Sequence, residues 1–155
     1  MKLSKTLIAE IFICGAIGIA IGMGFYTFNY AKGLAYLSNN PKACMNCHIM
    51  TEQYGSWTKS SHHHAATCND CHIPHEFPWK YMEKVRNGWN HSKAFTLQNF
   101  PEPIRISNHN LKILQANCIH CHEGMVSELV GHRGVKLDTL RCTDCHRSVG
   151  HMSLD

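Results

Sequence analysis

Charged residues are scarce in this sequence, where they make up 17% of 155 residues against about 25% in an average soluble domain. The sequence also lacks a phosphate-binding loop, a nucleophile triad and any signalling domain behind its cysteine motifs. These absences leave no obvious site for bond-making on a small substrate and no output for a sensor, and we expect no nucleic-acid partner. The nine cysteines and thirteen histidines are far above ordinary usage, so the composition points to a bound cofactor.

Residues 7–28 form a nearly unbroken apolar run in which Glu10 is the only ionisable group. A helix of this length can span a bilayer. Lys2 and Lys5 precede the run, which places the N-terminus in the cytoplasm and the rest of the chain in the periplasm. A secretory signal peptide is the alternative, but no small-x-small cleavage site follows. We therefore expect a single-pass anchor over residues 1–30 in a bacterial inner membrane, with an aromatic belt at its far end formed by Phe25, Tyr26, Phe28 and Tyr30.

Two further features of the apolar run carry weaker expectations. Gly18 and Gly22 form a GxxxG pair, which would allow self-association through the anchor. An ordinary small-residue helix surface explains the pair equally well. Cys14 lies in the same run, where a buried thiol behaves as a small hydrophobe, and we assign it no role.

The other eight cysteines fall in four CxxC pairs, each followed directly by histidine. CxxCH is the attachment signature of haem c, in which both thiols form thioethers and the histidine ligates iron. Zinc knuckles also use CxxC, but zinc does not require the following histidine, and its recurrence after all four pairs by chance is improbable. The sequence therefore predicts four covalently bound haems c, attached at Cys44, Cys47, Cys68, Cys71, Cys118, Cys121, Cys142 and Cys145, with motif histidines His48, His72, His122 and His146.

The motif spacing contains a repeat, because 24 residues separate Cys44 from Cys68 and again Cys118 from Cys142. This predicts two dihaem halves, at about 40–75 and 108–151, within a haem domain over residues 31–155. Only about 32 residues outside the apolar run serve each haem, so the haems must fill most of the interior. We expect a mostly α chain with much irregular structure, made of one transmembrane helix and a compact multihaem domain packed around four haems.

Four irons need up to four axial ligands beyond the motif histidines. The candidates are the nine other histidines, of which most must be ordinary surface residues. They are His62, His63, His64, His75, His91, His109, His120, His132 and His151.

The first motif is unusual, because it reads Cys-Met-Asn-Cys-His-Ile-Met and places Met50 two residues past the histidine. Together with Ser60-Ser61-His62, Gly88-Trp89-Asn90-His91 and the single anchor, this motif resembles the NapC/NirT family of quinol dehydrogenases. The likeness covers essentially the whole chain and is greatest to the family's smallest branch, the small subunits of cytochrome c nitrite reductases.

The resemblance implies a set of iron ligands. Met50, rather than His48, would ligate the first haem, whose other face would be open to quinol, although a gap-filling role for Met50 is the alternative. His62 and His151 would complete the two middle haems with His72 and His122. The fourth haem, held by His146, would face the partner and could take a lysine from it, which leaves His91 either unligated or a ligand when the partner is absent. His48 and His91 therefore stay possible iron ligands.

The segment from Phe77 to His91 predicts a helix with Pro78 in its first turn. One face is apolar, and the other is polar and could serve a quinol site, although a merely solvated face is the alternative. In the family a lysine matching Lys80 and an acid matching Asn87 approach the quinol. Asn87 departs from that pattern, so the proton acceptor stays open among Glu76, Glu83 and His91. The candidate quinol-site residues are Lys80, Glu83 and Asn87. A second helix is predicted from Ser107 or Asn108 through the third motif.

These expectations combine into a function in anaerobic respiration. The chain would take electrons from membrane quinol and pass them through four haems to a large multihaem reductase in the periplasm, most plausibly a nitrite reductase that forms ammonium. The alternative is a membrane-tethered tetrahaem shuttle without a quinol site, serving another reductase or a hydrogenase.

Overall fold

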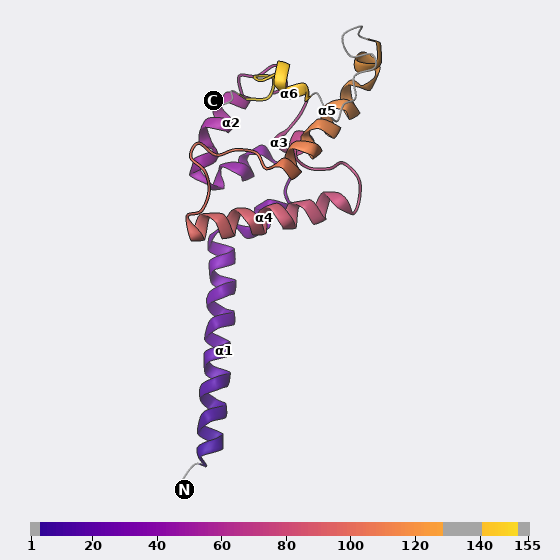
Figure 1. The fold of residues 1–155 in the computed structure, drawn as a ribbon. Coiled ribbons are helices and arrows are strands. Elements are labelled where there is room, and N and C mark those ends of the chain that lie inside the picture. The colour runs from indigo at the N-terminus through magenta and orange to yellow at the C-terminus, as the bar shows by residue number, and fades with distance from the viewer. Residues whose placement is uncertain (1–3, 129–140, 152–155) are drawn as a thin grey trace. The chain divides into compact units, whose positions relative to one another are not determined.

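The computed structural model describes residues 4–128 and 141–151 of the chain. It divides into two compact units, Met1–Ala35 and Tyr36–Asp155, which are described separately. The division falls shortly after residue 30, where the sequence places the end of the anchor. In the described ranges every regular element is a helix, either α or 3-10 (Figure 1). The expectation of a mostly helical chain is confirmed for these ranges.

The first unit is dominated by α1, which runs from Lys5 to Tyr30 over 26 residues. Ser4 caps it, because its Oγ accepts a hydrogen bond from the Leu7 amide at 3.2 Å. At 1.5 Å per residue α1 is about 39 Å long, enough to cross a hydrocarbon core of about 30 Å. Its side chains are apolar on every side and none is buried by other parts of the protein that the structure describes. A helix of this composition needs an apolar medium around it, which a bilayer supplies.

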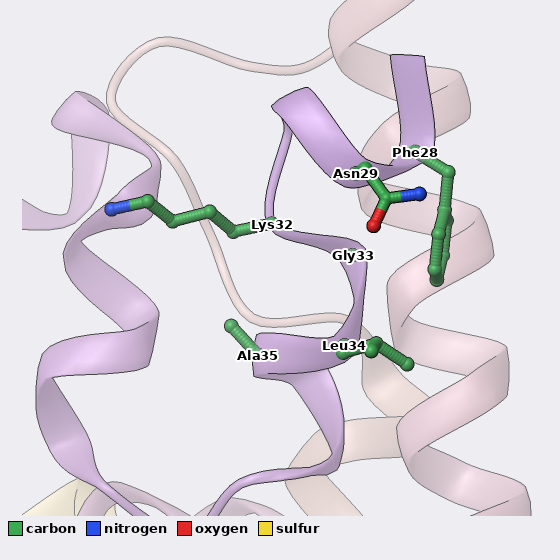
Figure 2. A pocket seen from close by; sticks show the side chains of 6 residues that line it. All are labelled: Phe28, Asn29, Lys32, Gly33, Leu34 and Ala35. Atoms are coloured by element: carbon green, nitrogen blue, oxygen red, sulfur yellow. The ribbon is translucent and has the colours of Figure 1, made fainter. Parts of the chain in front are cut away.

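The chain turns sharply where α1 ends. Lys32 adopts the left-handed conformation with a φ of 52°, and the 3-10 helix η1, Gly33–Leu37, follows at once. A side chain at Gly33 would collide with the ring of Phe28, so glycine is needed for this close approach. The turn encloses a small hollow lined by Phe28, Asn29, Lys32, Gly33, Leu34 and Ala35 (Figure 2).

The second unit places the cysteine motifs on short helical pieces. The 3-10 helices η2 and η3 carry the first motif and pack against α2, while α3, with the second motif, packs against α5, as does α6 with the fourth. The bounds are η2 Pro41–Asn46, η3 His48–Met50, α2 Thr51–Trp57, α3 Cys68–His72, α5 Asn108–Glu128 and α6 Cys142–Cys145.

Local sequence signals explain two of these helices. Thr67 and Asp70 form a capping box at the start of α3, in which the Asp70 carboxylate accepts from the Thr67 amide at 2.8 Å. Ser107 precedes α5, and its Oγ accepts from the Asn110 amide at 3.2 Å, as its place in the sequence predicted. The backbone of α5 leaves helical geometry at His122, the histidine of the third motif, with φ at −111°. The motif therefore marks a break in this helix.

Side chains supply little core in the second unit. Among described residues only Trp57 and Ile73 are buried apolar side chains. Asn117 is also buried, and its amide donates to the carbonyl oxygens of Cys71 and Ile73 at 2.9 Å each, which ties α5 to α3. So thin a core cannot balance the entropy of ordering a domain of this size, so a large apolar group must complete it.

The long helix α4, Trp79–Leu97, starts two residues later than the expected helix and extends six residues beyond it. Pro78 caps it directly, and Gln98, in the left-handed conformation with a φ of 53°, ends it. The polar face is the buried one, since Glu83, Lys84 and Asn87 are 7%, 2% and 8% exposed. The alternative of a solvated face is wrong for these three side chains, whereas Lys80 is only partly buried and His91 is exposed. The apolar side chains of α4 face outward instead.

Candidate haem-binding and quinol site

The cysteine motifs meet in pairs that follow the 24-residue repeat. The side chains of Cys44 and Cys68 are neighbours, and so are those of Cys118 and Cys142. The neighbouring Cys68 lowers the pKa of Cys44, and the neighbouring Cys44, together with burial, raises that of Cys68. Burial, reinforced by the neighbouring Cys142, raises the pKa of Cys118 to about 11. Each half of the domain thus brings the first thiols of its two motifs together.

The ring of His72, in the second motif, lies beside that of His151 near the C-terminus. Their centroids are 6.2 Å apart and the rings are inclined by only 15°. Iron–nitrogen bonds of about 2 Å on both faces of one iron place two imidazole centroids roughly 6 Å apart. Burial, together with the nearby His151 and His91, lowers the pKa of His72 to about 4, so its ring is neutral at physiological pH and able to bind iron.

A second pair has the same spacing. The ring centroids of His122, in the third motif, and His62 are 6.0 Å apart. The Nδ1 of His62 lies 3.0 Å from the carbonyl oxygen of Val149, to which it donates. That bond fixes the tautomer and leaves Nε2 as the free lone pair, the usual arrangement of a histidine that binds a metal.

Other neighbouring histidine rings do not fit a shared iron. His75 and His120 stack at 4.7 Å, and His63 and His64 meet at 4.6 Å, too close for a metal between their nitrogens. His63 also packs edge-on against Trp57 at 4.7 Å. These four side chains are packing residues in this structure, and His132 lies outside the described residues.

The remaining candidate ligands lie apart from these pairs. Met50 is half-buried at the start of α2, whereas His48 and His146 are exposed and stack on no other ring in the described ranges. His91 lies near Tyr36, with ring centroids 6.4 Å apart, and burial lowers its pKa. Its charge also lowers the pKa of His72, so His91 stands close to that pair.

The buried face of α4 contacts the segment that precedes the first motif. The Lys84 ammonium donates to the carbonyl oxygens of Leu37 and Ser38 and to Oδ1 of Asn39, each at 2.9 Å. All three of its donors are therefore used. Burial and the neighbouring Lys80 lower the pKa of Lys84. The positive charge of Lys84 in turn helps to lower the pKa of Cys44. Lys84 thus holds the backbone before the first motif.

Glu83 forms the other polar contact of this face. Its Oε2 accepts from Nε2 of His109 at 2.9 Å, while Nδ1 of His109 accepts from Arg86 at 3.1 Å. The second carboxylate oxygen, Oε1, is buried without a hydrogen-bond partner. Asn87 Oδ1 accepts from the amide of Asn110 at 3.1 Å. A buried carboxylate with one free oxygen can accept a proton at that oxygen.

Sequence reasoning missed the residues that support this face. His109 was one of nine candidate histidines, and its contact with Glu83 joins segments that the local pattern does not connect. Asn110 and Asn117 carry hydrogen bonds between helices without any motif of their own. Val149 acts through a backbone carbonyl, which no side-chain pattern can reveal.

These observations fit haem attached through thioethers and do not fit zinc. Two imidazole pairs have the spacing of axial ligands on one iron, and the protein core is nearly empty of apolar side chains in the part described. Zinc would require three or more convergent ligands, and the described residues contain no such cluster. The fold and the site define a c-type cytochrome with one N-terminal helix that is long and apolar enough to cross a membrane.

A family model described as the NapC/NirT cytochrome c family, N-terminal region, matches residues 4–155. The chain belongs to this family, and the resemblance noted in its motifs is confirmed. It is 40% identical to the cytochrome c-type protein NrfH of Wolinella succinogenes over 97% of this chain and 89% of the relative. It is 34% identical to the cytochrome c nitrite reductase subunit NrfH of Nitratidesulfovibrio vulgaris, over 80% and 74% of the two chains.

A solved structure gives the same relationship. A chain in the crystal structure of a cytochrome c nitrite reductase NrfHA complex bound to the HQNO inhibitor superposes with a TM-score of 0.65 at 27% identity. The match covers 94% of this chain and 92% of that chain. The similarity thus extends over the anchor and the haem domain together.

Proposed function

We propose that this chain is the quinol-oxidising, electron-transfer subunit of a cytochrome c nitrite reductase complex. It takes electrons from quinol in a bacterial inner membrane and passes them to a large periplasmic multihaem subunit that reduces nitrite. The similarity to NrfH over nearly the whole chain supports this role. The observation that carries it is the buried polar face of α4, where Glu83 keeps a free carboxylate oxygen and Lys84 binds the backbone just before the first motif.

Four haems c supply one-electron redox chemistry when bound to the four motifs. In this proposal His72 and His151 would hold the second haem, and His122 and His62 would hold the third. Two nitrogen ligands for each iron would keep such a site little changed on reduction, as a relay requires. Met50 would hold the first haem, and His146 would hold the fourth, whose other ligand could come from the partner subunit.

The quinol site uses the side chains of α4. Oxidation of one quinol to quinone releases two electrons and two protons, so the chain must accept protons while electrons leave. Glu83 accepts a proton at Oε1, while His109 holds the other carboxylate oxygen, Oε2, by donating a hydrogen bond from Nε2. Lys80 and Asn87 orient the quinol oxygens by hydrogen bonds. Lys84 has no free donor, so its role is to position the backbone.

The experiment compares two reductants of the same haems. Glu83→Gln should slow haem reduction by a quinol analogue by on the order of a hundredfold, because the proton acceptor is lost. Reduction by dithionite, which needs no quinol site, should be unchanged. Glu76→Gln is the matched control, since Glu76 is exposed and lies just before α4. If dithionite reduces the haems of the wild-type chain but no quinol analogue does, whether or not the inhibitor HQNO is present, the proposed function is wrong. That result would favour a simple electron shuttle.

A further inference from the structure

The outward face of α4 is apolar and aromatic. It consists of Trp79, Met82, Val85 and Trp89, which are 59%, 56%, 66% and 69% exposed. Their spacing of three or four residues places them on one side of the helix, opposite Glu83, Lys84 and Asn87. We propose that this outer face lies in the headgroup region of the bilayer, as a second membrane contact in addition to the anchor.

The packing of α4 is the reverse of a helix on a water-soluble domain. Such a helix buries its apolar stripe and leaves its polar stripe in water. Here Lys84 and Glu83 are buried and hydrogen-bonded, while the tryptophans point outward. Two tryptophans and a methionine on one face are unfavourable in water but favourable at a lipid surface, where the amphipathic indole ring is enriched.

The connection to the anchor favours lipid over another occupant of this face. Lys84 is bound to the carbonyl oxygens of Leu37 and Ser38, which follow the last residue of α1, Tyr30, by seven and eight positions. Even a fully extended chain of that length reaches only about 25–30 Å, and the 3-10 helix η1 shortens it further. Covalent connection alone therefore limits the distance between Lys84 and the end of α1, so α4 can reach the surface of a bilayer that α1 spans.

The charge near the outer face also suits lipid. Lys93 is exposed and stands eleven positions after Met82, on the same side of the helix. Long basic side chains at such positions extend to lipid phosphates while their stems cover apolar surface. Contact of the outer face with lipid would hold the buried polar face of α4 at the depth where quinol leaves the bilayer. This consequence rests on the proposed function, as does the use of the catalytic subunit in the test.

The contact can be tested on the full haem-loaded chain in complex with its catalytic subunit. The complex is placed in vesicles of phosphatidylethanolamine and phosphatidylglycerol that contain a lipid with a photoreactive diazirine in its acyl chain. After irradiation, peptide mass spectrometry should find lipid adducts on Met82, Val85 or Trp89 as well as on α1. Met125, which is 60% exposed on α5, is the control and should stay unlabelled. Adducts confined to α1, or equal labelling of Met125, would overturn the proposal.

A pair of variants separates lipid from a protein partner. Val85→Glu should lower the α4 adducts at least fivefold relative to those on α1, while Asn90→Glu, at an exposed polar position, should leave them unchanged. The four-haem absorption spectrum and co-purification with the catalytic subunit should be the same for both. If Val85→Glu instead releases the catalytic subunit, or if α4 adducts form only after that subunit is removed, the outer face is a protein interface and the proposal is wrong. The wild-type labelling decides the matter even if the variant does not fold.

Discussion

The imidazole rings of His72 and His151 lie almost parallel, with their centroids 6.2 Å apart, although one belongs to the second cysteine motif and the other follows the fourth. His62 and His122 form a second pair at 6.0 Å, again between the first and second halves of the motif repeat. Each pair therefore joins one half of the domain to the other. Two shared irons would make the halves into one folded unit, which explains how so thin a core can suffice.

Replacing His151 by alanine should convert one haem from low-spin to high-spin, because the iron loses one of its two nitrogen ligands. Electron paramagnetic resonance of the oxidised protein would measure the change. His120→Ala is the matched control, since His120 stacks on His75 at 4.7 Å and should ligate no iron. Unchanged spectra for both variants would contradict the assignment of His151.

Replacing His62 by methionine should raise the potential of one haem by on the order of 100 mV, because a thioether ligand favours reduced iron. Potentiometric titration followed by absorption would resolve the shift. His64→Met tests specificity, as His64 contacts only the ring of His63 among the described aromatic pairs. An equal shift in the two variants would show that His62 has no special role.

Lys84→Met should destabilise the haem domain by about 2–4 kcal/mol. The substitution leaves two carbonyl oxygens and an amide oxygen without their charged donor in a site where Lys84 is 2% exposed. Denaturant unfolding in detergent, followed by circular dichroism, measures the loss. Lys93→Met, at an exposed position of the same helix, should change stability by less than about 0.5 kcal/mol. Comparable losses would mean that the Lys84 bonds contribute nothing specific.

A chain produced without haem attachment should lose most of its helix in residues 36–155 while α1 stays helical in detergent. Only Trp57 and Ile73 are buried apolar side chains in the described part of the chain, which is too little to fold this unit alone. Circular dichroism of the haem-free and haem-loaded chains provides the comparison. Identical spectra would contradict a haem-built core.

The sequence predicted the elements whose signal is local. The apolar run gave α1 within two residues at each end, and Ser107 marked the start of α5 correctly. The periodicity around Trp89 also gave α4, but it could not say which face is buried, because a hydrophobic pattern does not specify the medium outside. Burial of Lys84 depends on carbonyl oxygens more than forty residues away along the chain, which no local signal encodes.

The candidate iron ligands divide in the same way. Each motif histidine is marked by its cysteines, whereas His151 and His62 entered only through resemblance to a family. Their pairing with His72 and His122 depends on the tertiary structure. The hydrogen bond between Glu83 and His109 could likewise not be predicted from the sequence, because it joins the buried face of α4 to the first turn of α5.

An intact mass spectrum of the mature chain, with an iron analysis of the same sample, tests the central claim most directly. The account predicts the polypeptide mass plus four haem groups, and four irons for each chain. A bare polypeptide mass, fewer than four haems, or zinc in place of iron would contradict it.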